Sequence, residues 1–131
     1  CSISDAVIAI FSHKFITNSP ILVFGDGEQT RDFIYVKDLA SFIVSSIEKT
    51  PEHKLFHLAN GKQVSVNEVC RILKEVSGFN GEFEHIEAVK GEVRDIVLDV
   101  KRAREELGWN PKTDIRAGIE ETWGFGGKIG L

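Results

Sequence analysis

Apolar residues recur at helical spacing in several separate stretches of the chain. Near its start, Ile3, Val7, Ile10, Phe11 and Phe15 fall on one face, which predicts a helix over residues 3–17. The same spacing predicts four further helices, over residues 36–50, 66–76, 100–107 and 114–123. Ser65 and Glu68 form a capping box before the third of these five helices, and Gly78 is placed to end it.

Short runs rich in β-branched and aromatic residues lie between the predicted helices. Turn residues bound most of them, which is typical of strands. The predicted extended segments cover residues 21–24, 31–36, 54–60, 63–65 and 82–89. The pattern therefore predicts an α/β fold of α+β character, in which a small mixed sheet of short strands packs with about five helices. A chain of 131 residues fits a single domain, residues 1–131.

Composition narrows the possible partners. The formal net charge is −4 and no basic run occurs, which argues against nucleic acid or a membrane surface as a partner. No apolar segment approaches the roughly 20 residues that span a bilayer. Cys1 and Cys70 lack metal or redox spacing, and the four histidines are scattered, so we expect no metal site and a reduced, buried thiol.

The first residue of the chain is Cys1, and a helical pattern begins almost at once. A natural start would carry methionine, so we expect this sequence to be a piece of a longer protein. The sequence alone leaves open whether such a truncation is natural.

Two arginines stand at the mouths of predicted strands. Arg31 lies in "GDGEQTRDF" (25–33), and Arg94 lies in "KGEVRD" (90–95). The planar guanidinium fork is a natural partner for a diphosphate, so two arginines on separate loops could clamp one. Each arginine also has acidic neighbours, so spacing alone favours ordinary surface ion pairs over a clamp.

Catalytic and cofactor motifs are missing from the sequence. Gly25 and Gly27 are followed by a predicted strand, whereas a dinucleotide-binding loop leads directly into a helix. Tyr35 is the only tyrosine, and Leu39 stands where a catalytic tyrosine of the short-chain dehydrogenase type would need a lysine. We therefore expect no catalytic residue and no bound cofactor in this chain.

Three stretches, in order, resemble the NAD-dependent sugar-nucleotide epimerase/dehydratase family, the extended short-chain dehydrogenases. They are "PILVFGDGEQTRDFIYVKDLA" (20–40), "FHLANGKQVSVNEVCRILKEVSG" (56–78) and "GEVRDIVLDVKRAREELGWNPKTDIRAGIEETW" (91–123). The resemblance covers nearly the whole chain and is strongest to the UDP-glucose 4-epimerases of that family. It implies that the chain is the C-terminal lobe that binds the nucleotide-sugar.

The resemblance also implies which residues hold the substrate. Arg31 would reach the diphosphate, and Leu22 and Phe24 would lie beside the base. Glu92 would lie near the ribose, and Arg94 would be a second arginine for the diphosphate. Family members often carry Asp at the position of Glu92, and some place the second arginine where this chain has Val89.

The same resemblance implies what the rest of the enzyme supplies. An N-terminal Rossmann domain, absent from this sequence, would bind NAD, which takes a hydride from C4 of a UDP-sugar or related nucleotide-sugar and returns it. The whole protein would be a cytoplasmic homodimer, and this lobe would be inactive alone. Two alternatives stay open, a stand-alone nucleotide-binding module and a structural or interaction fragment with no ligand of its own.

An apolar face would distinguish a lobe from a self-contained module. A lobe that packs against a second domain should expose a hydrophobic surface when described alone. Phe11, Phe15 and Phe42 are the candidates for that surface.

Overall fold

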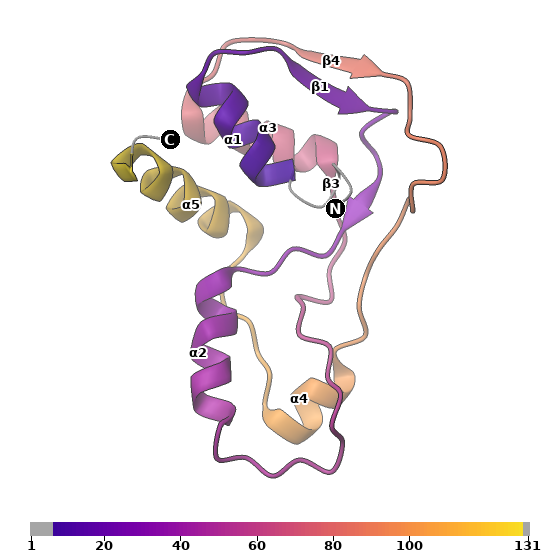
Figure 1. Ribbon diagram of the computed structural model, residues 1–131, viewed down its shortest axis with the longest axis vertical. Helices are drawn as coiled ribbons and strands as arrows, with labels where there is room; N and C mark the ends of the chain where they lie inside the picture. The colour runs from indigo at the N-terminus through magenta and orange to yellow at the C-terminus, as the bar shows by residue number, and fades with distance from the viewer. Residues whose placement is uncertain (1–6, 130–131) are drawn as a thin grey trace.

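A computed structural model of the protein describes residues 7–129. Its larger part packs three helices, α1 (Val7–Ile16), α3 (Val66–Ser77) and α5 (Ile115–Ile129), beside two parallel strands. The strands are β1 (Ile21–Phe24) and β4 (Phe83–Ile86), with Ile21 opposite Phe83 and Phe24 opposite Ile86. The helices lie together on one side of this strand pair (Figure 1).

One apolar cluster holds this larger part together. The fully buried residues come from β1 and from the inward faces of the helices, and they include Ile21, Val23, Ile72, Leu73 and Ile119. Cys70 lies in the same cluster, and burial raises the pKa of its thiol to about 12. This thiol is therefore protonated and unreactive at neutral pH, as the sequence predicts.

Two helices lie at the opposite end of the molecule from β1 and β4. They are α2 (Val36–Ser46) and α4 (Lys101–Leu107), and long irregular segments follow α2 and precede α4 (Figure 1). A second cluster, formed by Ala59, Val100, Ala103 and Trp109, holds this end together. The Trp109 indole N–H donates a 2.7 Å hydrogen bond to the carbonyl of Ala59, and its ring packs edge-to-face on Phe42.

A second, antiparallel pair of short strands connects the two ends. In it β2 (Thr30–Arg31) pairs with β3 (Val64–Ser65). Just beyond β2, the Asp32 carboxylate accepts hydrogen bonds from the backbone amides of Asn60, Gly61 and Leu98. The Asp32 side chain therefore links the segments around residues 60 and 98 to the end of β2, the strand that carries Arg31.

The sequence predictions for the helices hold with shifted ends. Ser65 accepts the Glu68 amide and Gly78 is left-handed (φ 70°), as predicted, but the Glu68 carboxylate pairs with Arg71 and does not return to the cap. The last helix runs on to Ile129, beyond the predicted end at 123. The first is described only from Val7, so residues 3–6 of its predicted range lie outside the described residues.

Two of the strand predictions are wrong. No strand forms over 54–60, where the chain is irregular and has no ladder partner within the described residues. Of the segment 31–36, only Arg31 belongs to a strand, because the chain turns into α2 at Val36. The predicted fold class, a mixed α/β arrangement of short strands with five helices, is confirmed, with the strands arranged as two separate pairs.

No helix within residues 7–129 has the length and apolar character required to cross a membrane.

Candidate functional site

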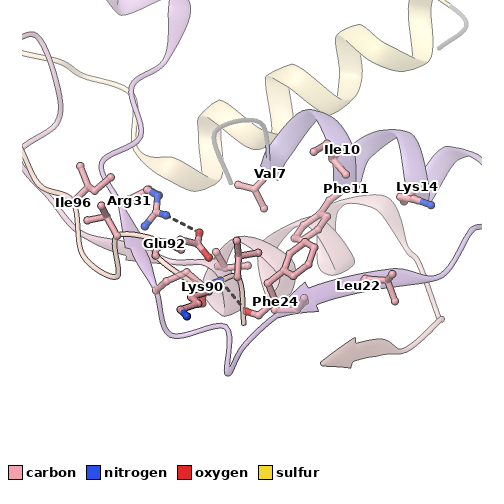
Figure 2. Close-up of a pocket in the computed structure, with 16 residues that line it drawn as sticks. Val7, Ile10, Phe11, Lys14, Leu22, Phe24, Arg31, Lys90, Glu92 and Ile96 are labelled. Carbon is pink, nitrogen blue, oxygen red and sulfur yellow. Dashed lines mark hydrogen bonds and ion pairs between the residues drawn. The ribbon is translucent and has the colours of Figure 1, made fainter. Parts of the chain in front are cut away.

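A pocket of about 670 Å³ opens between α1, β1 and the segment 89–96 (Figure 2). Apolar side chains of α1 form one wall, and those of β1 form the other. Its charged groups come mainly from β2 and from the segment after β4. The residues that line it include Phe11, Lys14, Leu22, Phe24, Gln29, Arg31, Lys90 and Glu92.

Arg31 lies at one end of this pocket and is held on several sides. Its Nη1 donates to the carbonyls of Thr30 (2.8 Å) and Arg94 (3.1 Å), and its Nη2 lies 2.8 Å from Glu92 Oε1. The residue is only 9% exposed, and its Nε is buried without a hydrogen-bond partner in the described part of the chain. The guanidinium is thus fixed in place and retains hydrogen-bonding capacity for an anion.

The backbone around Arg31 explains how a short loop can hold a charged side chain so firmly. The Thr30 amide donates to the Arg94 carbonyl (2.9 Å), and the Ile96 amide donates to the Thr30 carbonyl (3.2 Å). On its other side, β2 pairs with β3, where Arg31 lies opposite Val64. The arginine therefore lies between two segments that are far from it in the sequence.

The two glycines before β2 have a structural role. Gly27 has a positive φ of 75°, and a Cβ there would lie 2.0 Å from the Asn67 side-chain oxygen. Gly25 also has a positive φ, 66°, and the loop leads into β2. These residues make a tight turn against the start of α3, so they do not form the glycine cradle that NAD would require.

Gln29 is a part of the site that the sequence reasoning missed. It is buried, and its side-chain amide donates a 2.9 Å hydrogen bond to the carbonyl of Phe24. The Gly25 amide donates to Ile86 on β4, so by strand alternation the backbone groups of Phe24 and Leu22 point away from β4. The Leu22 backbone and the Phe24 N–H therefore lie on the open edge of β1, toward the pocket side.

Four of the five residues expected to bind substrate meet in this pocket. Leu22, Phe24, Arg31 and Glu92 all line it. Arg94 does not, because its side chain is 62% exposed and its Nη2 pairs with Asp26 Oδ2 at 2.9 Å. The hydrogen bond from Arg94 lowers the pKa of Asp26, and the same contact raises the pKa of Arg94. The two expected arginines thus do not face one ligand position.

The α1 wall and the two lysines were also missed from the sequence. Phe11 was expected on an exposed face, but it is 5% exposed and also lines the pocket. Lys14 lies at the far end from Arg31, and Lys90 lies at the same end as Arg31 and Glu92 (Figure 2). The helical pattern marks Phe11 as apolar and inward, but it does not say that a cavity borders it.

The pocket has the features of a binding site. It is lined mainly by apolar side chains, with Lys14, Arg31, Lys90 and Glu92 as its charged groups. It offers an apolar slot with a fixed guanidinium at one end, which fits a ligand that is planar at one end and anionic at the other.

Comparisons with known proteins identify the family of the chain. The family model described as GDP-mannose 4,6 dehydratase matches residues 3–122. A Methanocaldococcus jannaschii protein with the provisional name UDP-glucose 4-epimerase is 41% identical over 114 residues, which are 87% of this chain and 36% of that protein. The chain therefore belongs to the NAD-dependent sugar-nucleotide epimerase/dehydratase family, the extended short-chain dehydrogenases.

Solved structures match nearly the whole chain. The UDP-glucose 4-epimerase of Thermotoga maritima, solved with UDP-glucose, is 33% identical, has a TM-score of 0.88 and is matched over 95% of this chain and 40% of its own. The UDP-glucuronic acid 4-epimerase of Bacillus cereus, solved with UDP-glucuronic acid and NAD, shares the fold at 22% identity with a TM-score of 0.84, over 94% of this chain and 40% of its own. The chain spans about a third of the length of the curated relative and two fifths of these structures.

Proposed function

We propose that this chain is the nucleotide-sugar-binding lobe of an NAD-dependent UDP-sugar 4-epimerase of the UDP-glucose type. The observation that carries the proposal is the fixed Arg31 guanidinium at the end of an apolar pocket. The family of the chain and the relative solved with UDP-glucose support the choice of ligand.

In this proposal each end of the pocket binds a different part of the ligand. Arg31 binds the diphosphate, because it lines the pocket and Glu92 uses only one of the two Nη2 donors. The base lies against Leu22 and Phe24, where the open edge of β1 offers a backbone carbonyl and an amide to a pyrimidine. Glu92 uses one carboxylate oxygen for Arg31, which leaves the other for a ribose hydroxyl.

The chain contributes position and binding energy rather than redox chemistry. Holding the diphosphate and base in a fixed place would keep the sugar at a defined point while the reaction occurs elsewhere on the protein. NAD supplies the hydride chemistry in this family, and the residues described here do not fit it, because the Gly25–Gly27 loop turns into a strand. We therefore assign NAD binding to a Rossmann domain outside the 131 residues.

A large apolar surface on α2 supports the presence of that second domain. None of the α2 residues is buried. Three of its apolar side chains, those of Val36, Ile43 and Val44, are 67%, 53% and 70% exposed. Ile47, four residues after Ile43, extends the same surface and is 74% exposed. Contiguous exposed apolar side chains of this kind mark an interface.

The expected phenylalanines are not part of this surface. Phe11 and Phe15 are in the main cluster, and Phe42 packs on Trp109. The segment 54–60 follows α2, has the composition of a strand and has no ladder partner among the described residues. In this proposal the interface includes backbone pairing by this segment as well as side-chain packing. The homodimeric state and the cytoplasmic location of the whole protein stay predictions from the family resemblance.

Ligand binding tests the proposal directly. Calorimetric titration of the polypeptide as its gene encodes it should show binding of UDP-glucose and UDP. We expect dTDP-glucose and GDP-mannose to bind more weakly, because the α1 and β1 walls bound the space for the base. A protein that binds none of these nucleotides would refute the proposal, and tighter binding of GDP-mannose would change its substrate class.

The second domain has a separate test on α2. Val44→Arg should lower the free energy of unfolding of the intact polypeptide by about 2 kcal/mol if another domain covers this side chain, because a charge would then be buried. If Val44 stays exposed, as it is here, the change should remain within about 0.5 kcal/mol. Urea unfolding measures the difference.

Ser45→Arg is the matched control for this test. Ser45 is exposed on the same helix, and one residue of helical rotation, about 100°, turns it away from Val44 and from Ile43. Equal, small effects of both substitutions would favour the stand-alone module over a lobe of a larger enzyme.

A further inference from the structure

The charge at the Arg31 end of the pocket is less positive than the presence of an arginine suggests. Arg31 Nη2 and Glu92 Oε1 form an ion pair at 2.8 Å, and both side chains are largely buried. The Glu92 carboxylate therefore offsets part of the attraction between Arg31 and a bound anion. A diphosphate bound here would be stabilised by a second cation.

Arg94 does not supply that cation. Its side chain points to Asp26, and it does not line the pocket. Arg94 takes part in the site through its backbone carbonyl, which accepts a hydrogen bond from Arg31 Nη1. Its own charge is balanced by the Asp26 carboxylate outside the pocket.

Lys90 is placed to supply this second cation. The Glu92 amide donates to the Val89 carbonyl (3.2 Å), which closes a tight turn over residues 89–92 with Gly91 at a positive φ of 84°. The turn holds Lys90 and Glu92 on either side of this glycine, and both line the pocket. Lys90 lies at the Arg31 end (Figure 2), and within the described part of the chain it forms no ion pair.

We propose that Lys90 is the second cationic contact for the ligand's diphosphate, in the place that the sequence motif gives to Arg94. The inference rests on the proposed function, because it takes the ligand to be a nucleoside diphosphate sugar. It changes the clamp from two arginines to one fixed arginine and one lysine on a turn. An ammonium group attracts the diphosphate as a point charge and does not form a bidentate contact, so it leaves the orientation of the ligand to Arg31.

The test compares three variants of the polypeptide as its gene encodes it. Lys90→Gln should weaken UDP-glucose binding about tenfold, the size of one charge-assisted hydrogen bond, and should make the remaining binding less sensitive to salt. Arg94→Gln should change the affinity less than about threefold, because it breaks an exposed ion pair only. Lys62→Gln is the matched control, an exposed lysine that does not line the pocket.

Uridine distinguishes a phosphate contact from a general disturbance of the pocket. Lys90→Gln should leave uridine binding unchanged, since uridine has no phosphate. If wild-type protein binds UDP-glucose and Lys90→Gln binds it equally well, or if Arg94→Gln loses the tenfold instead, the assignment of Lys90 is wrong while the proposed function stands. If the wild type binds none of UDP-glucose, dTDP-glucose and GDP-mannose, both are wrong.

Discussion

Replacement of Arg31 by alanine is expected to lower the affinity of the intact polypeptide for UDP-glucose about 100-fold, or ~2.7 kcal/mol. The expected loss is large for two reasons. The guanidinium is the one arginine side chain among the described residues that lines the pocket, and it is held by three contacts before any ligand arrives. A preorganised charged donor loses little entropy on binding, so most of its hydrogen-bond energy appears as affinity. Isothermal titration calorimetry measures the effect.

Two further variants make the Arg31 result specific. Arg31→Lys keeps the charge but loses the fork, so its affinity should fall between those of wild type and Arg31→Ala. Uridine should bind all three proteins alike. Because Arg31 also joins Thr30, Arg94 and Glu92, unfolding by urea should be measured first, to show that the variants are folded. An Arg31→Ala protein that is folded and binds UDP-glucose within threefold of wild type would contradict the role of this residue.

Trp109→Ala is expected to destabilise the protein by about 3–5 kcal/mol. Trp109 is 2% exposed, and it is the largest member of the small cluster that joins α2 to α4. Its removal leaves a cavity against Phe42 and an unsatisfied carbonyl at Ala59. Urea unfolding monitored by circular dichroism measures the loss without relying on tryptophan fluorescence.

Trp109→Phe separates the two contributions to this loss. It keeps most of the ring and removes the hydrogen bond, so the expected cost is about 1–2 kcal/mol. A Trp109→Ala protein as stable as wild type would mean that the second cluster contributes little on its own. Equal losses for the two variants would mean that the Ala59 hydrogen bond, and not the packing, carries the stability.

Local features of the fold could be predicted from the sequence because local chemistry determines them. Ser65 and Gly78 mark the ends of α3 correctly, since a hydroxyl cap and a left-handed residue act over three or four positions. The β1 run is short and apolar, and it forms the strand expected of it. These elements do not depend on which other segments lie beside them.

Features that depend on distant partners were predicted less well. The run 54–60 has the composition of a strand, but a strand also needs a neighbour, and none of the described segments pairs with it. No motif marks the partners of Trp109, whose side chain hydrogen-bonds to Ala59, 50 positions earlier, and packs on Phe42, 67 positions earlier. Periodicity contains no information on either partnership.

The candidate site shows the same division. The motif around Arg31 points to the residue that the structure fixes in the pocket. The motif around Arg94 names a residue of the right chemistry, but Asp26, 68 positions earlier, turns its side chain away. Lys90 and Gln29 have no motif, and only the folded arrangement of the 89–92 turn and of β1 brings them to the pocket.

The parallel pairing of β1 with β4 sets an order of events during folding. Ile21 lies opposite Phe83, 62 positions later in the sequence. During synthesis β1, which forms one wall of the pocket, therefore leaves the ribosome well before its partner β4. Non-local parallel pairing of this kind is slow, because a long loop must close before the contact forms. The pocket also needs the segment 89–96, so it exists only after most of the chain has been synthesised. A nucleotide can therefore stabilise the finished protein against unfolding, but it has no site to bind during the early collapse of the chain.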